Sequence, residues 1–282
     1  MRYGNCVSYK DLDKIKVLKA VGFDYIETGL SALYGANLEE VRAFTQAIAE
    51  NEISCEAVNV FFPGEVILVG ELVDFAAVRE YVDEVCEKTK HIGFKTAVFG
   101  SGRARNCPEG FQRERAVEQL VTLTREILRP AAEKYNFTIA VEPLNTDETN
   151  TINILREAEY IAERADSENI KVLADLYHMT KESDTLTNLD NLNLLAHCHI
   201  SEPITRKYPH ASDPAKHIEI CRQFFADLHD RGYDGRMSIE AGLAGITPPD
   251  AYAIPDDIDV MYREFYYEAA STLEFLKSLK CD

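Results

Sequence analysis

Four short apolar runs in the second half of the chain each carry a side chain that could bind a metal ion. The four residues are Glu142 in IAVE, Asp175 in VLAD, His199 in HCHIS and Glu240 in MSIE. Three carboxylates and one imidazole suit Mn²⁺, Mg²⁺ or Co²⁺, with Zn²⁺ less favoured than at sites rich in His or Cys. Each residue alone could equally be a helix N-cap or a surface acid, because the chain has 48 Asp and Glu residues. Their recurrence in successive apolar runs favours one shared site for a divalent metal.

The histidines near these runs differ in the position that the sequence predicts for them. His197 and His199 alternate along one strand, so both point the same way at different depths. His199 is nearer the C-terminal end and is the better ligand, whereas His197 is expected to pack lower in the barrel. His178 follows Asp175 by three residues and could be a ligand, a substrate contact or the partner of a carboxylate; we favour the substrate contact. The remaining histidines are expected at the surface: His91, His210, His217 and His229.

Short apolar runs alternate with amphipathic helical runs along the chain. Strands are expected near residues 2–6, 25–28, 53–59, 96–100, 138–142, 170–175, 197–201 and 236–240. Helices are expected near 11–21, 38–50, 74–91, 112–134, 153–164, 215–231 and 259–279. This alternation predicts a single (β/α)₈ TIM barrel over residues 1–282, although an open doubly wound sheet has the same pattern. Because no Gly-rich nucleotide-binding motif follows a strand, the barrel is favoured, with its active site at the C-terminal ends of the strands.

Some segments depart from regular elements. Pro130 stands inside a helical run, so we expect a kink or a break there. The stretch 181–196 is rich in Asn and Asp and gives the weakest helical signal. The longest irregular stretches follow expected strands, at 60–72, 101–111, 202–214 and 243–257. Phe61 and Phe62, in the first of these, could line a substrate site or belong to the core.

The composition restricts the class of protein. The 282 residues are 46% hydrophobic and carry a formal net charge of −18, from 30 Lys and Arg against 48 Asp and Glu. This hydrophobic content supports a packed core, and the acidic balance argues against nucleic acid as a partner. The seven cysteines form no C-x-x-C pair, and no run is apolar enough for a signal peptide or a membrane span. We therefore expect a reduced, cytoplasmic protein with no membrane partner.

The motifs around the candidate residues resemble those of the xylose-isomerase-like TIM-barrel superfamily of sugar isomerases and epimerases. They are VEPLNTDE (141–148), LADLYHM (173–179), HCHISE (197–202) and MSIEAG (237–242), together with the loop FGSGRARNCPEGF (99–111). The chain is most similar to the D-tagatose 3-epimerase/D-psicose 3-epimerase group and to inosose isomerase. The resemblance covers nearly the whole chain, is most specific over residues 138–242, and implies a homo-oligomer that is a dimer or a tetramer.

The resemblance also assigns roles to the four candidate ligands. It implies that a divalent metal, with Mn²⁺ favoured over Co²⁺, Mg²⁺ and Zn²⁺, is bound by Glu142, Asp175, His199 and Glu240. It further implies that Glu142 and Glu240 are the catalytic pair that handles the substrate proton. The metal would act as a Lewis acid on the substrate carbonyl, while one glutamate removes the proton from the neighbouring carbon.

Three further residues are implied to bind substrate. Glu148 is the second acid of the E-x-L-N-x-x-E pattern, and His178 matches the epimerase histidine that contacts a substrate oxygen. The epimerases place an arginine six residues after the metal-binding histidine, where this chain has Thr205, and Arg206 follows one residue later. A one-residue shift of this loop would preserve the contact through Arg206, but the departure leaves the identity of the substrate open.

These features predict that the chain epimerises a free ketose at the carbon next to the carbonyl, through a cis-enediolate. The alternative is an aldose–ketose or inosose isomerase, because the same four ligands serve both reactions. An apurinic endonuclease would need further His ligands and a basic groove, which the sequence does not show, and a non-catalytic barrel would normally have lost a ligand. An unphosphorylated substrate is expected because no obvious Gly-rich phosphate cradle follows the seventh or eighth strand. The features that would instead favour a phosphorylated substrate are Arg206, Lys207 and the segment Gly242–Gly245.

Overall fold

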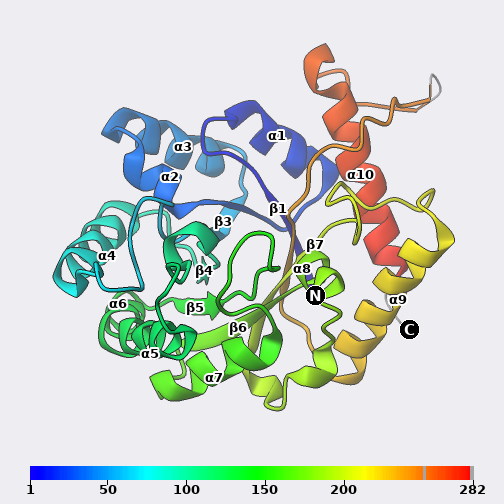
Figure 1. Ribbon diagram of the computed structural model, residues 1–282. Coiled ribbons are helices and arrows are strands. Elements are labelled where there is room, and N and C mark those ends of the chain that lie inside the picture. Colours follow the sequence, from blue (N-terminus) through cyan, green and yellow to red (C-terminus); the bar gives the residue numbers. More distant parts are fainter. Residues whose placement is uncertain (250–251, 280–282) are drawn as a thin grey trace.

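Eight parallel strands close into a barrel in the order in which they follow one another along the chain (Figure 1). The computed structural model describes residues 1–249 and 252–279. The strands are β1 (Arg2–Cys6), β2 (Tyr25–Gly29), β3 (Ser54–Asn59), β4 (Thr96–Phe99), β5 (Thr138–Val141), β6 (Ile170–Asp175), β7 (Leu195–Ile200) and β8 (Arg236–Ile239). The barrel is closed by pairing of β1 with β8, where Arg2 lies opposite Arg236. The closure confirms the predicted TIM barrel and excludes the open doubly wound sheet.

Helices surround the barrel and cover the outer face of the strands (Figure 1). They are α1 (Leu12–Val21), α2 (Leu30–Gly35), α3 (Leu38–Glu50), α4 (Phe75–Thr89), α5 (Arg113–Leu123), α6 (Arg129–Tyr135), α7 (Leu155–Ala165), α8 (Leu176–Lys181), α9 (Ala215–Asp230) and α10 (Arg263–Ser278). The expected helices are present, with bounds that differ by a few residues. The short helices α2 and α8 were not predicted, because one or two turns are too short for a periodic pattern to show.

The helix expected over 112–134 is interrupted as predicted. A π-helical segment, Thr124–Leu128, separates α5 from α6, and Pro130 lies in the first turn of α6. Proline is tolerated there because the first N–H groups of a helix have no partner within the helix. The weak helical stretch 181–196 contains two short 3₁₀ turns, at Leu186–Asn188 and Leu192–Leu194.

The main hydrophobic core lies between the barrel and its helices, and Phe61 and Phe62 belong to it. Both rings are fully buried, and the Phe62 ring packs edge-on against Phe99 with 5.7 Å between centroids. The Phe61 carbonyl accepts a hydrogen bond from the Tyr81 hydroxyl at 2.7 Å. These two phenylalanines are therefore core residues and do not line a substrate site.

Within the described parts of the chain, no helix is long and apolar enough to cross a membrane. The six cysteines that the structure describes are free thiols. Cys281 and residues 250–251 of the expected loop 243–257 lie outside the described residues.

Candidate metal centre

The four side chains at the ends of β5 to β8 meet at one point above the barrel. Each of Glu142, Asp175, His199 and Glu240 offers a ligand atom, and these atoms all lie within 4.8 Å of one another. His199 Nδ1 is 3.2 Å from Glu142 Oε1, and 3.8 Å from both Asp175 Oδ2 and Glu240 Oε2. Three of the side chains are buried, while that of Glu240 remains 22% exposed. The structure thus brings together the four residues that the sequence singled out.

Strand register explains why the four groups converge. Asp175 lies opposite His199 in the pairing of β6 with β7. Glu142 and Glu240 stand one residue beyond β5 and β8, but their backbone N–H groups still bond to the neighbouring strands, at Phe99 O (3.2 Å) and Ile200 O (3.1 Å). Both glutamates are therefore held at the C-terminal edge of the barrel, where parallel strands present their last side chains.

Asp175 is both a helix N-cap and a member of the four-residue cluster, which the sequence analysis gave as alternatives. Its Oδ1 accepts a hydrogen bond from the His178 N–H at 3.0 Å and caps the N-terminus of α8. Its Oδ2 faces His199 Nδ1. The N-cap interpretation and the site interpretation are therefore compatible, because each uses a different oxygen of the same carboxylate.

The electrostatics of the cluster favour a cation. Burial raises the pKa of the Glu240 carboxyl, and the nearby carboxylates of Glu142 and Asp175 raise it further. Burial alone would lower the pKa of the His199 imidazole, but Glu27 and Glu240 raise it well above its usual value. Three carboxylates crowded in a buried site are costly unless positive charge compensates them. The donor set of three carboxylates and one imidazole fits a divalent ion.

Arg206 and Glu148 lie at the rim of this cluster. Arg206 donates hydrogen bonds to Glu148 Oε1 at 2.7 Å and to Glu240 Oε2 at 2.8 Å. Its guanidinium also lies over the ring of Tyr177, 5.1 Å from the centroid. The backbone of Arg206 has a φ of 56°, which lies in the left-handed region. The loop after β7 therefore turns sharply and directs the arginine into the site.

His178 is oriented as a hydrogen-bond donor. Its Nδ1 accepts a hydrogen bond from the backbone N–H of Asn145 at 3.0 Å, so the proton of the neutral ring lies on Nε2. Nε2 is buried and has no partner among the described residues. A buried donor without a partner is costly, and a ligand oxygen would satisfy it.

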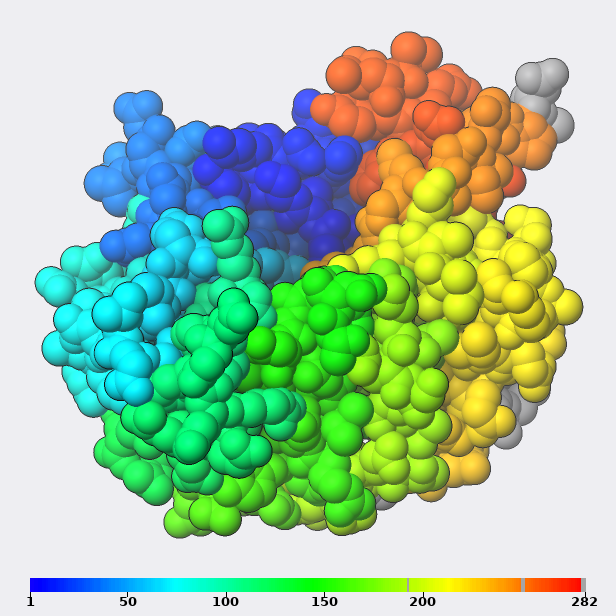
Figure 2. Space-filling view, viewed as in Figure 1, coloured from blue at the N-terminus to red at the C-terminus, as the bar shows by residue number. Residues whose placement is uncertain are grey.

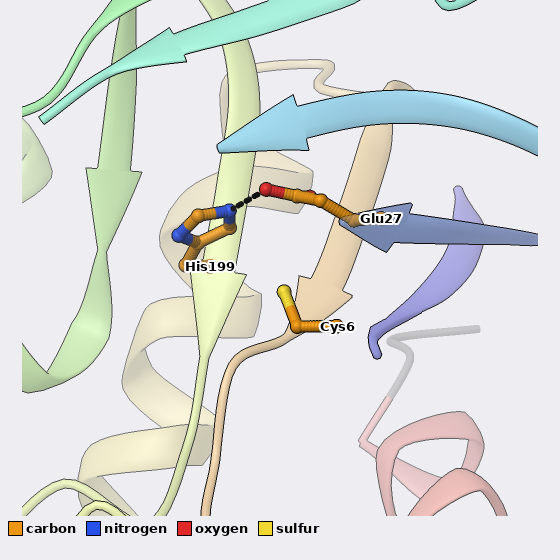
Figure 3. Close-up of side chains that lie close together, drawn as sticks. All are labelled: Cys6, Glu27 and His199. Atoms are coloured by element: carbon orange, nitrogen blue, oxygen red, sulfur yellow. Dashed lines mark hydrogen bonds and ion pairs between the residues drawn. The ribbon is translucent and has the colours of Figure 1, made fainter. Parts of the chain in front are cut away.

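Glu27 is a buried carboxylate that sequence reasoning missed. It lies on β2 and accepts hydrogen bonds from His197 Nε2 at 2.8 Å and from His199 Nε2 at 2.9 Å. Figure 3 shows the second of these bonds, with Cys6 of β1 beside it. Burial alone would raise the pKa of the Glu27 carboxyl, but the two imidazoles and their hydrogen bonds lower it below its usual value. His197 is fully buried beside Glu27, in agreement with the lower position predicted for it.

A cavity of about 320 Å³ adjoins Glu27. Its lining comes from the ends of β1, β2 and β3 and the residues that follow β1 and β2: Cys6, Val7, Ser8, Tyr9, Glu27, Thr28, Gly29, Ala32 and Asn59. The dark-blue N-terminal segment borders the hollow near the centre of Figure 2. Asn59 Nδ2 donates a hydrogen bond to Glu240 Oε1 at 3.1 Å, so the cavity adjoins the four-residue cluster. A cavity of this volume can hold a small molecule beside the cluster.

Two of the histidines expected at the surface are buried. His91 and His229 are exposed as expected, but the prediction was wrong for His210 and His217. His217, on α9, pairs through Nδ1 with Oε1 of the buried Glu202. Glu202 Oε2 in turn accepts hydrogen bonds within the loop that carries Arg206. The burial of His217 depends on this contact between two distant segments, which no local pattern reveals.

Comparison with known proteins places this geometry in a family. The family model described as xylose isomerase-like TIM barrel matches residues 15–264. The 3-dehydro-D-guloside 4-epimerase of Escherichia coli (strain K12) is 26% identical over 251 residues, which cover 86% of this chain and 90% of the relative.

Solved structures share the fold over the whole chain. D-psicose 3-epimerase from Clostridium cellulolyticum H10, solved with D-tagatose, has a TM-score of 0.77 at 18% identity and covers 100% of both chains. The IOLI protein, solved with a binding zinc atom, has a TM-score of 0.65 at 16% identity and covers 99% of this chain and 96% of its own. The closed barrel and the match over residues 15–264 together show that the chain belongs to the xylose isomerase-like TIM-barrel family.

Proposed function

We propose that this chain is an isomerase that epimerises an unphosphorylated keto-sugar at the carbon next to the keto group, with a divalent metal held by Glu142, Asp175, His199 and Glu240. The convergence of these four groups within 4.8 Å carries the proposal. The zinc atom in the structure of the IOLI protein supports a metal in a barrel of this type. A bound divalent ion would act as a Lewis acid on the keto oxygen and the adjacent hydroxyl oxygen of the sugar.

Glu142 and Glu240 are the proposed proton-transfer pair. One carboxylate would remove the proton from the carbon next to the keto group, and the other would return a proton to the opposite side of that carbon. Each is oriented by a neighbour: Glu240 by Asn59 and Arg206, and Glu142 by close packing against Gly100. His178 Nε2–H and the Arg206 guanidinium would donate hydrogen bonds to sugar oxygens, and Glu148 would accept one from a hydroxyl.

Epimerisation is favoured over isomerisation by the name of the Escherichia coli relative. Its name, 3-dehydro-D-guloside 4-epimerase, describes a change at the carbon beside the keto carbon. Return of the proton to the neighbouring carbon would instead interconvert an aldose and a ketose, and the same metal ligands serve that reaction. The same relative also favours a keto-glycoside as a second candidate substrate besides a free ketose.

An unphosphorylated substrate is supported by the loop after β8. The backbone N–H groups of Ala244, Gly245 and Ile246 point together and could cradle an anion. All three instead donate to the carboxylate of the buried Glu268 on α10, at 2.6, 2.6 and 2.8 Å. These three N–H groups are therefore occupied by the chain's own carboxylate and are not free to bind a phosphate.

The experiment that tests this function is an epimerase assay on chelator-treated protein, before and after addition of Mn²⁺. D-psicose, D-fructose, D-tagatose, a 3-keto-glucoside and a ketose phosphate would be followed by proton NMR. We expect metal-dependent inversion at the carbon beside the keto group of an unphosphorylated sugar. Conversion of a ketose to an aldose would establish the isomerase alternative, and a tenfold or greater preference for the phosphate in kcat/KM would contradict the unphosphorylated substrate.

A further inference from the structure

The interior of the barrel beneath the metal centre holds a hydrogen-bonded layer centred on Glu27. Glu27 Oε1 accepts from His199 Nε2, while Oε2 accepts from His197 Nε2 and from the Ser238 hydroxyl at 2.6 Å. All four side chains are fully buried. A carboxylate can only accept hydrogen bonds, so each of its three partners must supply a proton.

Two further observations fix the direction of these bonds. The Ser238 hydroxyl has one proton, which goes to Glu27, so the Tyr25 hydroxyl at 2.9 Å must donate to Ser238 Oγ. His197 Nδ1 has no partner in the described part of the chain, so the His197 proton that is used lies on Nε2. Gly4 leaves room for Tyr25, because a Cβ at Gly4 would lie 2.2 Å from the Tyr25 ring. The hydrogen bonds that reach Glu27 and Ser238 thus have one consistent arrangement of protons.

We propose that Glu27 is a positioning residue that holds the Nε2 proton of His199 and thereby leaves Nδ1, which faces Glu142, Asp175 and Glu240, as the ring nitrogen available to a metal. This role rests on the proposed metal centre, because it matters only if His199 is a ligand. A neutral imidazole carries one proton, and a metal can bind only the nitrogen without it. Outer carboxylates of this kind orient the histidines that bind metals and raise their basicity.

The same residues admit a different interpretation, which the hydrogen bonds oppose. Cys6 Sγ, Glu27 and His199 also lie within 4.8 Å of one another and could form a second metal site (Figure 3). A metal there would need the Nε2 lone pair of His199 and an oxygen of Glu27. Both oxygens of Glu27 already accept hydrogen bonds, and Nε2 of His199 carries the proton that Glu27 accepts. Cys6 is therefore a neighbour of the network and not a ligand.

The test compares Glu27→Gln with Cys6→Ser in the full-length chain. Gln keeps the size of Glu27 but places an N–H₂ group where one of the two acceptor oxygens was. The dissociation constant and stoichiometry of Co²⁺ would be measured by calorimetry after chelator treatment. We expect one ion per wild-type chain, about 10–100-fold weaker binding for Glu27→Gln, and an unchanged constant and stoichiometry for Cys6→Ser.

A second measurement uses the wild type and so does not depend on whether Glu27→Gln folds. Long-range proton–nitrogen NMR spectra of Zn²⁺-loaded, ¹⁵N-histidine-labelled wild type would locate the proton of His199, with His199→Gln for assignment. We expect that proton on Nε2. A proton on Nδ1, or Co²⁺ binding by folded Glu27→Gln within threefold of the wild type, would overturn the role of Glu27. Loss of one bound ion in Cys6→Ser would favour the second metal site, whereas absence of metal binding by the wild type would contradict the proposed function itself.

Discussion

Gly100, the residue after β4, leaves the space that the Glu142 carboxylate occupies. A Cβ at position 100 would lie 2.2 Å from Glu142 Oε2, so the carboxylate would have to move. Because this carboxylate is the flexible end of a side chain, we expect Gly100→Ala to fold but to misplace it. Misplacement of a catalytic group by about 1 Å can cost about 100-fold in rate. We expect a fall of at least about tenfold in kcat/KM and weaker binding of Co²⁺, measured by kinetics and calorimetry.

A matched control for this substitution is Gly35→Ala, where a Cβ would meet nothing within 4 Å. Its kinetic constants and metal affinity should equal those of the wild type. Wild-type metal affinity and kcat/KM in Gly100→Ala would show that the position of the Glu142 carboxylate does not matter.

At the residue scale, the sequence predicted the groups that end a strand more readily than those inside the barrel. Glu142, Asp175 and Glu240 each follow an apolar run, so position alone revealed them. Glu27 stands two residues before the end of β2 in YIETG, and an acid within an apolar run is the signal that would have found it. The roles of Glu27 and Ser238 follow from contacts between strands that are distant in the sequence, and sequence patterns do not reveal which side chains meet there.

At the element scale, the loop after β7 is held by Glu202. Its Oε2 accepts hydrogen bonds from Ile204 N at 2.9 Å, Thr205 N at 2.5 Å and Thr205 Oγ1 at 2.7 Å, while Oε1 pairs with His217 on α9. Hydrogen bonds to a charged group are each worth about 1.5–3 kcal/mol. Glu202→Gln should therefore loosen the turn that carries Arg206.

We expect Glu202→Gln to raise KM for the sugar by about tenfold, which corresponds to about 1.4 kcal/mol, with little change in metal affinity. The same substitution at Glu219, which is exposed on α9, is the control and should leave both quantities unchanged. Steady-state kinetics and Co²⁺ titration measure the two effects. A KM equal to that of the wild type would mean that Arg206 does not need this support or does not contact the sugar.

The helices and strands were predicted wherever their periodic pattern of apolar residues extends over enough residues to be recognised. Alternation of apolar and amphipathic runs located the strands, and Pro130 indicated the break before α6. The helix α8 was missed because LYHMTK, with 6 residues, is shorter than two turns. It forms because Asp175 caps it, and the cap also orients that carboxylate toward the metal centre.

At the scale of the whole molecule, ion pairs at the N-terminal end of the barrel link three strands. Glu56 on β3 accepts hydrogen bonds from Arg2 on β1 and from Arg236 Nε on β8, the latter at 2.7 Å. Its side chain is 14% exposed. Burial alone would raise the pKa of Glu56, but hydrogen bonds from Arg236, Ser54 and Arg2 lower it below the usual 4.5. A carboxyl whose pKa is lowered in the folded state stabilises the fold above the unfolded pKa, and this contribution is lost as pH falls.

Glu56→Gln should therefore reduce the free energy of unfolding by about 1–3 kcal/mol at pH 7. The difference from the wild type should shrink as pH falls from 4.5 through the lower native pKa of Glu56. Urea unfolding at pH 7 and at the most acidic pH where the chain stays folded measures both values. Glu163→Gln, on an exposed part of α7, is the control. A difference that grows toward acid pH would contradict this sign.

The fold as a whole could be predicted because eight repeats of one pattern leave few architectures. Closure of the barrel could not be derived from periodicity alone, since an open sheet repeats in the same way. It depends on the pairing of β1 with β8, between segments more than 230 residues apart in the sequence. The substrate could not be predicted either, because the loop after β7 departs from the epimerase pattern at Thr205 and Arg206.

Deuterium exchange tests the central claim most directly, namely that Glu142 and Glu240 form a two-base pair at a metal centre. Wild type, Glu142→Gln and Glu240→Gln would be loaded with metal and incubated in D₂O with the keto-sugar that the wild type epimerises. Gln keeps an oxygen that can bind the metal but cannot accept the proton as a base. Proton NMR would follow both deuterium in the starting sugar and formation of the epimer.

The two-base account expects at least one variant to exchange deuterium into the starting sugar, because the remaining glutamate still serves its own face. The same variant should form epimer at least about 10²-fold more slowly, the usual value of a positioned proton-transfer group. Epimerisation at the wild-type rate by either metal-loaded variant would contradict the two-base account and leave a one-base isomerase as the better interpretation.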